Sequence, residues 1–314
     1  MNSDISARAL AEAGSEIRTP FRLALSGDVA VEVRKILRVL PGRRIAGDGV
    51  WQGKRVLAKV FLGRDARRHG ERERSGVESL NRAGLATPAL LHAGAAGEDG
   101  YVVVTEWLEG AGTLAEAWEN PAVGSPGSAA GLDALRGVLS LFGQLHAAGL
   151  AQNDPHIGNF LISGDKPFLI DGDGVGRLGQ PAGEAAVKNL ALLLAQLSPA
   201  WDAWSMQVVD AWERESGFRA DPGVLGGAIR DARAWRLRRF LPKTLRNCTQ
   251  FRVDRSWDCF RSAVRSLPGD FLAALEDPDA LVAKGRLLKD GRTCTVAACE
   301  VSGRTVVIKR YNVK

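Results

Sequence analysis

Alternating hydrophobic and polar positions early in the chain predict a small antiparallel sheet. Residues 31–40, VEVRKILRVL, alternate in this way and are rich in β-branched side chains, as expected of a strand. Residues 45–51 and 55–61 form the next two strand-like segments, and the turn sequences PGRR and QG separate the three. We therefore expect a three-stranded antiparallel meander with Lys59 inside its third strand.

The pattern that follows the meander predicts mainly helices. Apolar residues recur at helical spacing in residues 132–148, and residues 101–108 form a continuous apolar run typical of a buried strand that leads into a hinge. The other expected helices are residues 67–83, 114–118, 184–197, 201–216 and 221–234, and the other expected strand is residues 90–95. Residues 120–131 are rich in glycine, serine and proline, and are expected to form a flexible linker.

The composition is that of an ordinary soluble globular protein. The chain has 314 residues, enough for one large or two ordinary domains, with 45% hydrophobic and 25% charged residues. Its first residues are polar and lack the apolar run of a secretory signal. The most apolar stretch, residues 190–197, is too short to span a bilayer. We therefore expect a cytoplasmic protein.

Charge and cysteine content narrow the classes of partner. The net charge of +6 and pI near 9.3 favour a nucleotide, a nucleic acid or an anionic membrane surface. We find no zinc-finger spacing and no aromatic RNA-binding signature, so a nucleic-acid partner is not expected. The four cysteines form no C-x-x-C pair and have no nearby histidines, so neither a zinc site nor a disulfide framework is expected.

Three polar side chains stand out in the otherwise apolar stretch 145–175. Asp154 and Asn159 are five residues apart, a spacing that suits a loop, and Asp171 follows an apolar run where a strand would end. A hairpin between residues 160–170 would return Asp171 to that loop. Two carboxylates and an amide are what a magnesium–nucleotide site requires, because Mg²⁺ takes oxygen ligands and keeps phosphates in its remaining positions. The alternative is a pair of Asx turns with only local hydrogen bonds.

The order D-x-x-x-x-N followed by an aspartate at a strand end is the catalytic half of the protein-kinase signature. The stretch resembles the lipopolysaccharide kinase family, which phosphorylates sugars of the bacterial lipopolysaccharide inner core. The resemblance implies an α+β, bilobal protein-kinase-like fold and phosphoryl transfer with ATP and Mg²⁺. Residues 1–108 would form the small antiparallel-sheet N-lobe, and residues 109–276 the mainly helical C-lobe.

The resemblance also implies roles for individual residues. Asp154 would orient and deprotonate the acceptor hydroxyl, while Asn159 and Asp171 would hold the metal. Lys59 would grip the nucleotide phosphates and pair with a glutamate of the next helix, for which the pattern E-R-x-x-V-E favours Glu73, with Glu71 next. The remaining nucleotide contacts would come from Gly42 in the first turn and from the backbone of Glu106 and Leu108. Without the resemblance, Lys59 reads as an outward-facing strand residue and the glutamates as a solvated helix face.

Three positions depart from the kinase pattern. The first turn has only Gly42 where kinases carry several glycines, which leaves the neighbouring arginines, Arg43 and Arg44, as candidates for phosphate contact. Gln152 stands where kinases commonly have a histidine whose role is mainly architectural. Asp171-Gly172-Asp173 replaces D-F-G and loses the aromatic residue.

The last third of the chain carries two further features. Residues 230–246 mix seven basic residues with tryptophan, leucine and phenylalanine, which suits either an anionic membrane surface or an exposed helix with its apolar side facing the core. Residues 286–311 repeat the opening meander, because Gly303 to Lys309 matches Gly53 to Lys59. Tandem members of the lipopolysaccharide kinase family are similar, and we expect residues 277–314 either to dock on the first domain or to begin an incomplete second unit.

The preferred function is an ATP-dependent kinase that phosphorylates a heptose or Kdo hydroxyl of the lipopolysaccharide inner core. Its partners would be ATP, an acidic glycolipid or sugar acceptor, and the inner face of the inner membrane. One alternative is a nucleotide-binding pseudokinase that scaffolds envelope biogenesis. Another is a small-molecule phosphotransferase of the aminoglycoside or choline type, which shares the same loop.

Overall fold

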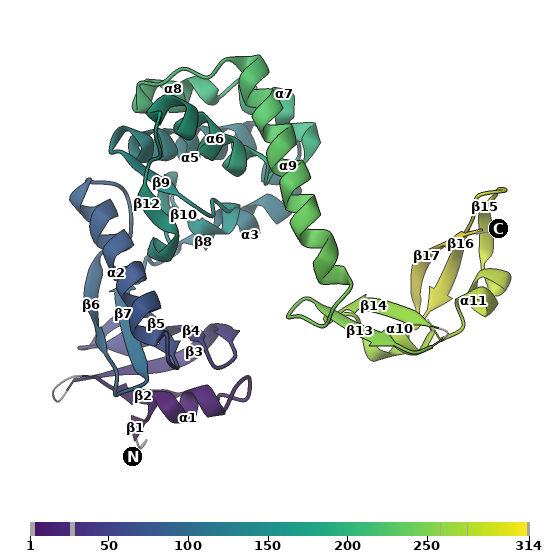
Figure 1. The fold of residues 1–314 in the computed structure, drawn as a ribbon, viewed down its shortest axis with the longest axis horizontal. Helices are drawn as coiled ribbons and strands as arrows, with labels where there is room; N and C mark the ends of the chain where they lie inside the picture. Colours follow the sequence, from purple (N-terminus) through teal and green to yellow (C-terminus); the bar gives the residue numbers. More distant parts are fainter. Residues whose placement is uncertain (1–3, 26–28, 258, 275, 313–314) are drawn as a thin grey trace. The chain divides into compact units, whose positions relative to one another are not determined.

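The computed structural model describes residues 4–25, 29–257, 259–274 and 276–312. The chain forms two compact units, Met1–Arg233 and Ala234–Lys314 (Figure 1). The boundaries predicted from the sequence, after residues 108 and 276, stay predictions. Among the described residues, no helix is long and apolar enough to cross a membrane.

The first unit begins with a seven-stranded sheet in the order β1-β2-β3-β4-β5-β7-β6. Its strands are β1 Asp4–Ile5, β2 Phe21–Ala24, β3 Ala30–Leu40, β4 Arg44–Trp51, β5 Lys54–Leu62, β6 Leu90–Ala95 and β7 Gly100–Glu106. The expected meander is the centre of this sheet, and β4 and β5 pair in register from Arg44 with Phe61 to Trp51 with Lys54. Gln52 and Gly53 take φ values of 48° and 75° in the connecting turn, as a two-residue hairpin requires.

The alternation along β5 sorts its side chains between two layers. Val56, Ala58 and Val60 are buried on one face, where α1 Ala7–Glu12 covers them. Lys59 and Phe61 point to the opposite face, where Phe61 packs with Tyr101 and with Ala66 at the start of α2 Ala66–Arg82. The sheet therefore presents Lys59 to the side that carries α2.

The remainder of the first unit is mainly helical (Figure 1). Its helices are α3 Leu114–Glu119, α4 Pro121–Gly124, α5 Ala129–Ala147, α6 Ala182–Leu194, α7 Asp202–Met206, α8 Val209–Ser216 and the start of α9 Pro222–Thr244. Its strands are β8 Gly112–Thr113, β9 Leu150–Gln152, β10 Phe160–Ser163, β11 Lys166–Leu169 and β12 Val175–Arg177. The core centres on large buried side chains of these helices and of the segment that precedes α7: Leu139, Phe142, Leu190, Trp201 and Trp212.

Two segments differ from the sequence-based expectation. The stretch expected to be a flexible linker contains α4 and the start of α5. It is held by Ser128, whose Oγ donates to the carbonyl of Val123, and by the Trp201 indole, which donates to the carbonyl of Gly124. The single helix expected over residues 201–216 is divided into α7 and α8. In both cases tertiary contacts override the local composition.

His146 ties the helical core together near the end of α5. Trp212 Nε1 donates to its Nδ1 at 2.8 Å, which leaves its Nε2 to donate to Asn189 Oδ1 at 3.0 Å. Burial lowers the pKa of His146 to about 4, so the ring is neutral near pH 7. Asn189 also donates to the carbonyl of Gln152 at 2.8 Å, and the network thereby reaches the loop that carries Asp154.

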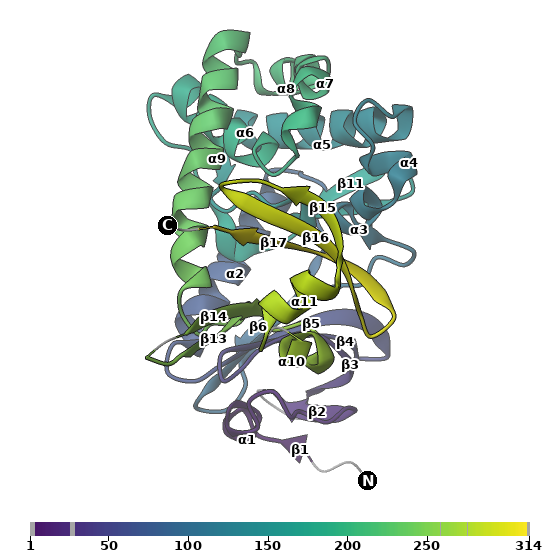
Figure 2. The same cartoon turned by 90° about the vertical axis from the view of Figure 1, so that its right-hand side faces the viewer.

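The second unit contains a hairpin, two short helices and a three-stranded meander (Figure 2). Its elements after α9 are β13 Phe251–Arg255, β14 Phe260–Val264, α10 Gly269–Ala274, α11 Pro278–Lys284, β15 Arg286–Asp290, β16 Cys294–Val301 and β17 Arg304–Tyr311. Every pair of β16 and β17 lies 250 residues after its counterpart in β4 and β5. The turn at Ser302 and Gly303 repeats the positive φ values, 48° and 73°. The repetition seen in the sequence is thus also a repetition of strand register.

Candidate active site

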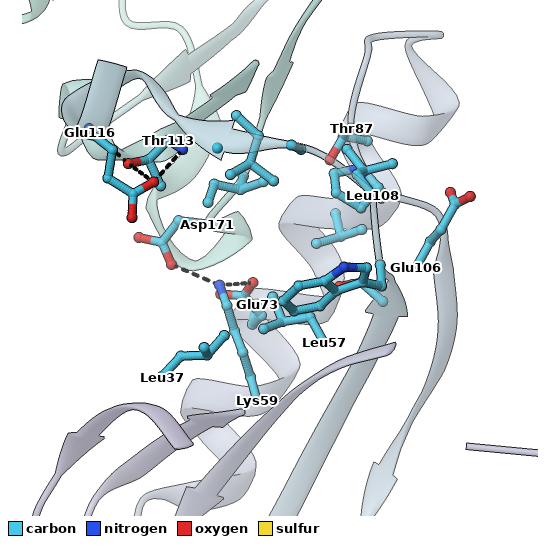
Figure 3. A pocket seen from close by; sticks show the side chains of 18 residues that line it. Leu37, Leu57, Lys59, Glu73, Thr87, Glu106, Leu108, Thr113, Glu116 and Asp171 are labelled. Atoms are coloured by element: carbon cyan, nitrogen blue, oxygen red, sulfur yellow. Dashed lines mark hydrogen bonds and ion pairs between the residues drawn. The ribbon is translucent and has the colours of Figure 1, made fainter. Parts of the chain in front are cut away.

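Lys59, Glu73 and Asp171 form one ion-pair network in the first unit (Figure 3). The Lys59 Nζ donates to Glu73 Oε1 at 2.6 Å and to Asp171 Oδ1 at 3.1 Å. Glu73 comes from a buried position of α2, and its side chain is only 2% exposed. Of the two glutamates weighed from the sequence, Glu73 therefore meets Lys59, whereas Glu71 accepts from Arg67.

The network keeps both Lys59 and Asp171 charged. Burial alone would lower the pKa of Lys59, but the carboxylates of Glu73 and then Asp171 outweigh it, and the pKa is raised. Burial would likewise raise the pKa of Asp171, but the Lys59 ammonium, followed by Arg44 and Arg38, holds it below its ordinary value. A buried lysine is tolerated here because two carboxylates compensate its charge.

Glu73 also fixes the segment that follows Asp171. Its carboxylate accepts from the backbone N–H groups of Gly172 and Asp173 at 3.2 and 3.0 Å. The backbone of α2 approaches this segment so closely that a Cβ on Gly76 would overlap the carbonyl oxygen of Gly172. A Cβ on Gly172 would in turn overlap the carbonyl oxygen of Glu73. There is consequently no room for the aromatic residue of D-F-G.

Gln152 links the two halves of the candidate catalytic segment. This fully buried side chain donates through Nε2 to the carbonyl of Asp171 at 3.1 Å, and its Oε1 accepts from the N–H of Asp154 at 3.4 Å. Asp171 has a φ of 74°, a left-handed conformation that costs a non-glycine residue about 1–3 kcal/mol and is typical of functional sites. Gln152 therefore performs the architectural task expected of the kinase histidine.

Asp154 and Asn159 lie in the loop between β9 and β10. The Asn159 Nδ2 donates to the carbonyl of Asp154 at 3.2 Å, and its own carbonyl accepts from Ile170 N–H at 2.8 Å. The hairpin of β10 and β11, paired from Phe160 with Leu169, brings the start of this segment back to its end. The loop is thus adjacent to Asp171, although neither Asp154 nor Asn159 lines the cavity described next.

A cavity of about 380 Å³ opens beside the ion-pair network (Figure 3). Its walls are mainly apolar and come from both the sheet and the helical part: Leu37, Leu57, Val77, Leu108, Leu161 and Ile170. Lys59, Glu73 and Asp171 supply charge at one end. A volume in this range with apolar walls and a few convergent polar groups is typical of a small-molecule site.

The hinge residues and the first turn are placed differently with respect to this cavity. Glu106 and Leu108 line it, but the Glu106 side chain points away from it (Figure 3). The Glu106 N–H donates to the carbonyl of Ala89 at 2.9 Å, and the Leu108 carbonyl accepts from Ala111 N–H at 3.3 Å. Gly42 is not part of the lining; it lies in the turn between β3 and β4 with a φ of 65°.

Sequence reasoning did not identify several residues of the cavity. Leu37 is among them, as are Thr87, Thr113 and Glu116. Thr113 and Glu116 could have been noticed in the sequence, because T-x-x-E is the pattern of a capping box. In the structure Thr113 Oγ1 accepts from Glu116 N–H, and the Glu116 carboxylate accepts from Thr113 N–H at 2.8 Å. The hydrogen bond from the Thr113 N–H, followed by one from the Thr113 hydroxyl, lowers the pKa of Glu116 and fixes a carboxylate at the cavity wall.

The residues present fit a magnesium ion held partly by a substrate. Nowhere in the described ranges do three or more His, Cys, Asp or Glu side chains gather as a metal site of their own. Asp171 offers a carboxylate of lowered pKa, and the neighbouring Asn159 offers an amide oxygen. One or two protein oxygens completed by phosphate and water is the usual arrangement for Mg²⁺.

A strand-rich part, a helical part and the Lys59–Glu73–Asp171 network between them define a protein-kinase-like fold. No protein-family model and no curated protein matches the sequence. The solved structures that resemble this chain include WaaP in complex with acyl carrier protein, 21% identical, covering 66% of this chain and 88% of its own, with a TM-score of 0.45. Another is vaccinia related kinase 3, 10% identical, covering 85% and 86%, with a TM-score of 0.44.

Proposed function

We propose that this protein is an ATP-dependent kinase that phosphorylates a hydroxyl group. The observation that carries the proposal is the Lys59–Glu73–Asp171 network at the end of an apolar cavity. The apolar walls suit an adenine base, and the charged end suits the phosphates. A strained aspartate beside a buried lysine is an expensive arrangement, and sites of this kind are usually retained for chemistry.

In the proposed reaction, Lys59 holds the phosphates of ATP and Asp154 accepts a hydrogen bond from the acceptor hydroxyl. The acceptor oxygen forms a bond to the γ-phosphorus, the bond from that phosphorus to the β,γ-bridging oxygen breaks, and ADP leaves. The acceptor proton passes to the Asp154 carboxylate. A Mg²⁺ ion held by Asp171 and Asn159 would supply charge stabilisation for the phosphates. Positioning and electrostatics provide most of the rate in such transfers.

The finer part of the proposal is the acceptor, a heptose or Kdo hydroxyl of the lipopolysaccharide inner core. The resemblance of residues 145–175 to the lipopolysaccharide kinase family supports it. The net charge of +6 also supports an acidic acceptor, because a positively charged protein attracts an anionic substrate.

The end of α9 supports a peripheral contact with the inner face of an anionic membrane. Its apolar side chains are exposed, with Trp235 at 44%, Leu237 at 56% and Phe240 at 41%, which supports the membrane surface over a helix whose apolar side faces the core. Basic residues interleave with them. Co-sedimentation with vesicles containing anionic phospholipid, and none with neutral vesicles, is expected. Trp235→Ser together with Phe240→Ser should reduce it several-fold, and full binding by that variant would exclude this surface.

Turnover of ATP with Mg²⁺ tests the proposed function directly. We expect ADP formation that depends on deacylated lipopolysaccharide core, and a loss of about 10²–10⁴-fold in Asp154→Asn, the range for a removed general base. Binding of ATP to Asp154→Asn should be unchanged, because this side chain does not line the cavity. The assay includes an aminoglycoside and choline as alternative acceptors.

Each contrary result has a distinct meaning. Turnover with the aminoglycoside or choline alone would replace the glycolipid by a small-molecule acceptor. ATP binding without turnover on any acceptor would favour the pseudokinase. Absence of ATP binding by the wild-type protein would refute the nucleotide site itself.

A further inference from the structure

The strand that follows the glycine-poor turn carries an arginine toward the ion-pair network. In the register of the sheet, Arg38 pairs with Ala46 and Ala46 pairs with Lys59, so these three side chains share one face. Arg44 lies two residues before Ala46 on the same strand and therefore on the same face. The face that presents Lys59 to Asp171 thus has two further cations beside it.

Arg44 is the cation of this pair that reaches the site. Its Nη1 lies 4.0 Å from Asp171 Oδ1, and its side chain is only 21% exposed. Among the described residues its guanidinium makes that one ion pair and no hydrogen bond. A guanidinium has five N–H donors in a planar fork, so a half-buried arginine with this contact alone has donors left for a ligand.

Two neighbouring arginines, Arg55 and Arg43, do not combine partial burial with a single ion pair as Arg44 does. Arg55 lies on the same face, but Asp48 and Glu109 both accept from its guanidinium, which also stacks over Trp107 at 4.2 Å. Arg43, the adjacent residue, is exposed. Of the two arginines that the sequence offered as phosphate ligands, only Arg44 faces the carboxylate that would meet the phosphates.

We propose that Arg44 binds the phosphates of the nucleotide, and that its guanidinium supplies the donors which a glycine-rich loop would supply from its backbone. The inference rests on the proposed function and names a binding residue for that same site. Arginine forms two parallel hydrogen bonds to a phosphate group. Lys59, Arg44 and Arg38 oppose the carboxylates of Glu73 and Asp171, so the formal charge of the five groups is positive and ready for an anionic ligand.

Equilibrium binding of ATP, ADP and adenosine to the full chain tests this inference. Arg44→Met keeps an unbranched apolar stem as far as the position of Nε and removes the fork. It should weaken ATP and ADP about 10- to 100-fold, the effect of one or two hydrogen bonds to a charged group, while adenosine binding stays within about twofold. Arg43→Met is the matched control and should change none of the three affinities by more than about twofold. Arg44→Lys should fall between Arg44→Met and the wild type.

The outcomes separate this inference from the proposed function. Equal weakening of ATP and adenosine by Arg44→Met would make Arg44 a structural residue and overturn the inference, as would unchanged ATP binding. If the wild type binds ATP no better than adenosine, no phosphate contact of this kind exists, although the nucleoside site stands. If the wild type binds neither, the proposed function fails as well. Thermal melting of each variant shows whether it is folded.

Discussion

Asp171→Asn should lower the turnover of ATP by about 10²–10³-fold while adenosine binding is retained. The amide keeps the size of the side chain, but it removes the charge that Lys59 and Arg44 face and the carboxylate offered to Mg²⁺. Loss of one preorganised charge contact at a reacting phosphate costs this much in comparable sites. Turnover measured across a series of Mg²⁺ concentrations provides the test, and the variant should need far more metal to reach its residual rate.

Asp165→Asn is the matched control, since Asp165 lies exposed in the turn between β10 and β11 of the same hairpin. It should leave both turnover and metal dependence unchanged. A rate for Asp171→Asn within tenfold of the wild type, with the same metal dependence, would remove Asp171 from the site. Asp173, which pairs with Arg72 at 3.1 Å, would then be the carboxylate to examine.

The residues of the ion-pair network were expected from the sequence through the family resemblance, which gave a role to positions whose local pattern was ordinary. Lys59 stands in an alternating strand, so its face follows from the period of two. Asp171 ends an apolar run, and its order after Asp154 and Asn159 is a motif. The structure brings Lys59 and Asp171, 112 residues apart, to 3.1 Å. The resemblance placed both residues in one site, whereas their direct contact is seen only in the structure.

Close backbone contacts could not be predicted in this way. The approach of Gly76 to Gly172 depends on how α2 docks on the segment after β11, and a lone glycine inside a helical pattern gives no indication of its neighbour. Gln152 was read as a departure from a histidine, whereas its two hydrogen bonds show that an amide joins Asp171 to Asp154 equally well. The apolar lining of the cavity likewise depends on how the sheet packs against the helical part, and only its charged residues and its hinge segment were anticipated.

The repeat in the second unit shows that the same strand pairing can form without the same functional site. Lys309 occupies the position of Lys59 in the repeated hairpin, and the strand register is preserved. Its surroundings are different, because Lys309 is exposed and lies over the Tyr311 ring at 4.6 Å. In the described part of the chain it forms no ion pair with a carboxylate. Local sequence thus reproduces the hairpin, whereas the chemistry of Lys59 also needs α2 and the segment after β11.

The same dependence on α2 predicts that Glu73→Ala destabilises the protein by about 3–5 kcal/mol, the usual effect of removing one partner from a buried ion pair. The N–H groups of Gly172 and Asp173 lose their acceptor, and the Lys59 ammonium keeps only Asp171. Urea unfolding should show the transition of the first unit at a markedly lower midpoint. Because the chain has two units, the transition is followed by hydrogen exchange of amides in α2 and β5.

Lys59→Met is the informative comparison, because it removes the buried cation and leaves Glu73 with its two backbone donors. It should cost well under half as much as Glu73→Ala, although it removes the same ion pair. The double variant, Lys59→Met with Glu73→Ala, should be more stable than Glu73→Ala alone, since the buried Lys59 ammonium no longer lacks one of its two carboxylates. Equal losses in the two single variants would mean that the Lys59–Glu73 pair itself, rather than the anchoring of the Gly172 segment by Glu73, accounts for the stability. The close packing of α2 against Gly172 would then have to hold that segment without the carboxylate.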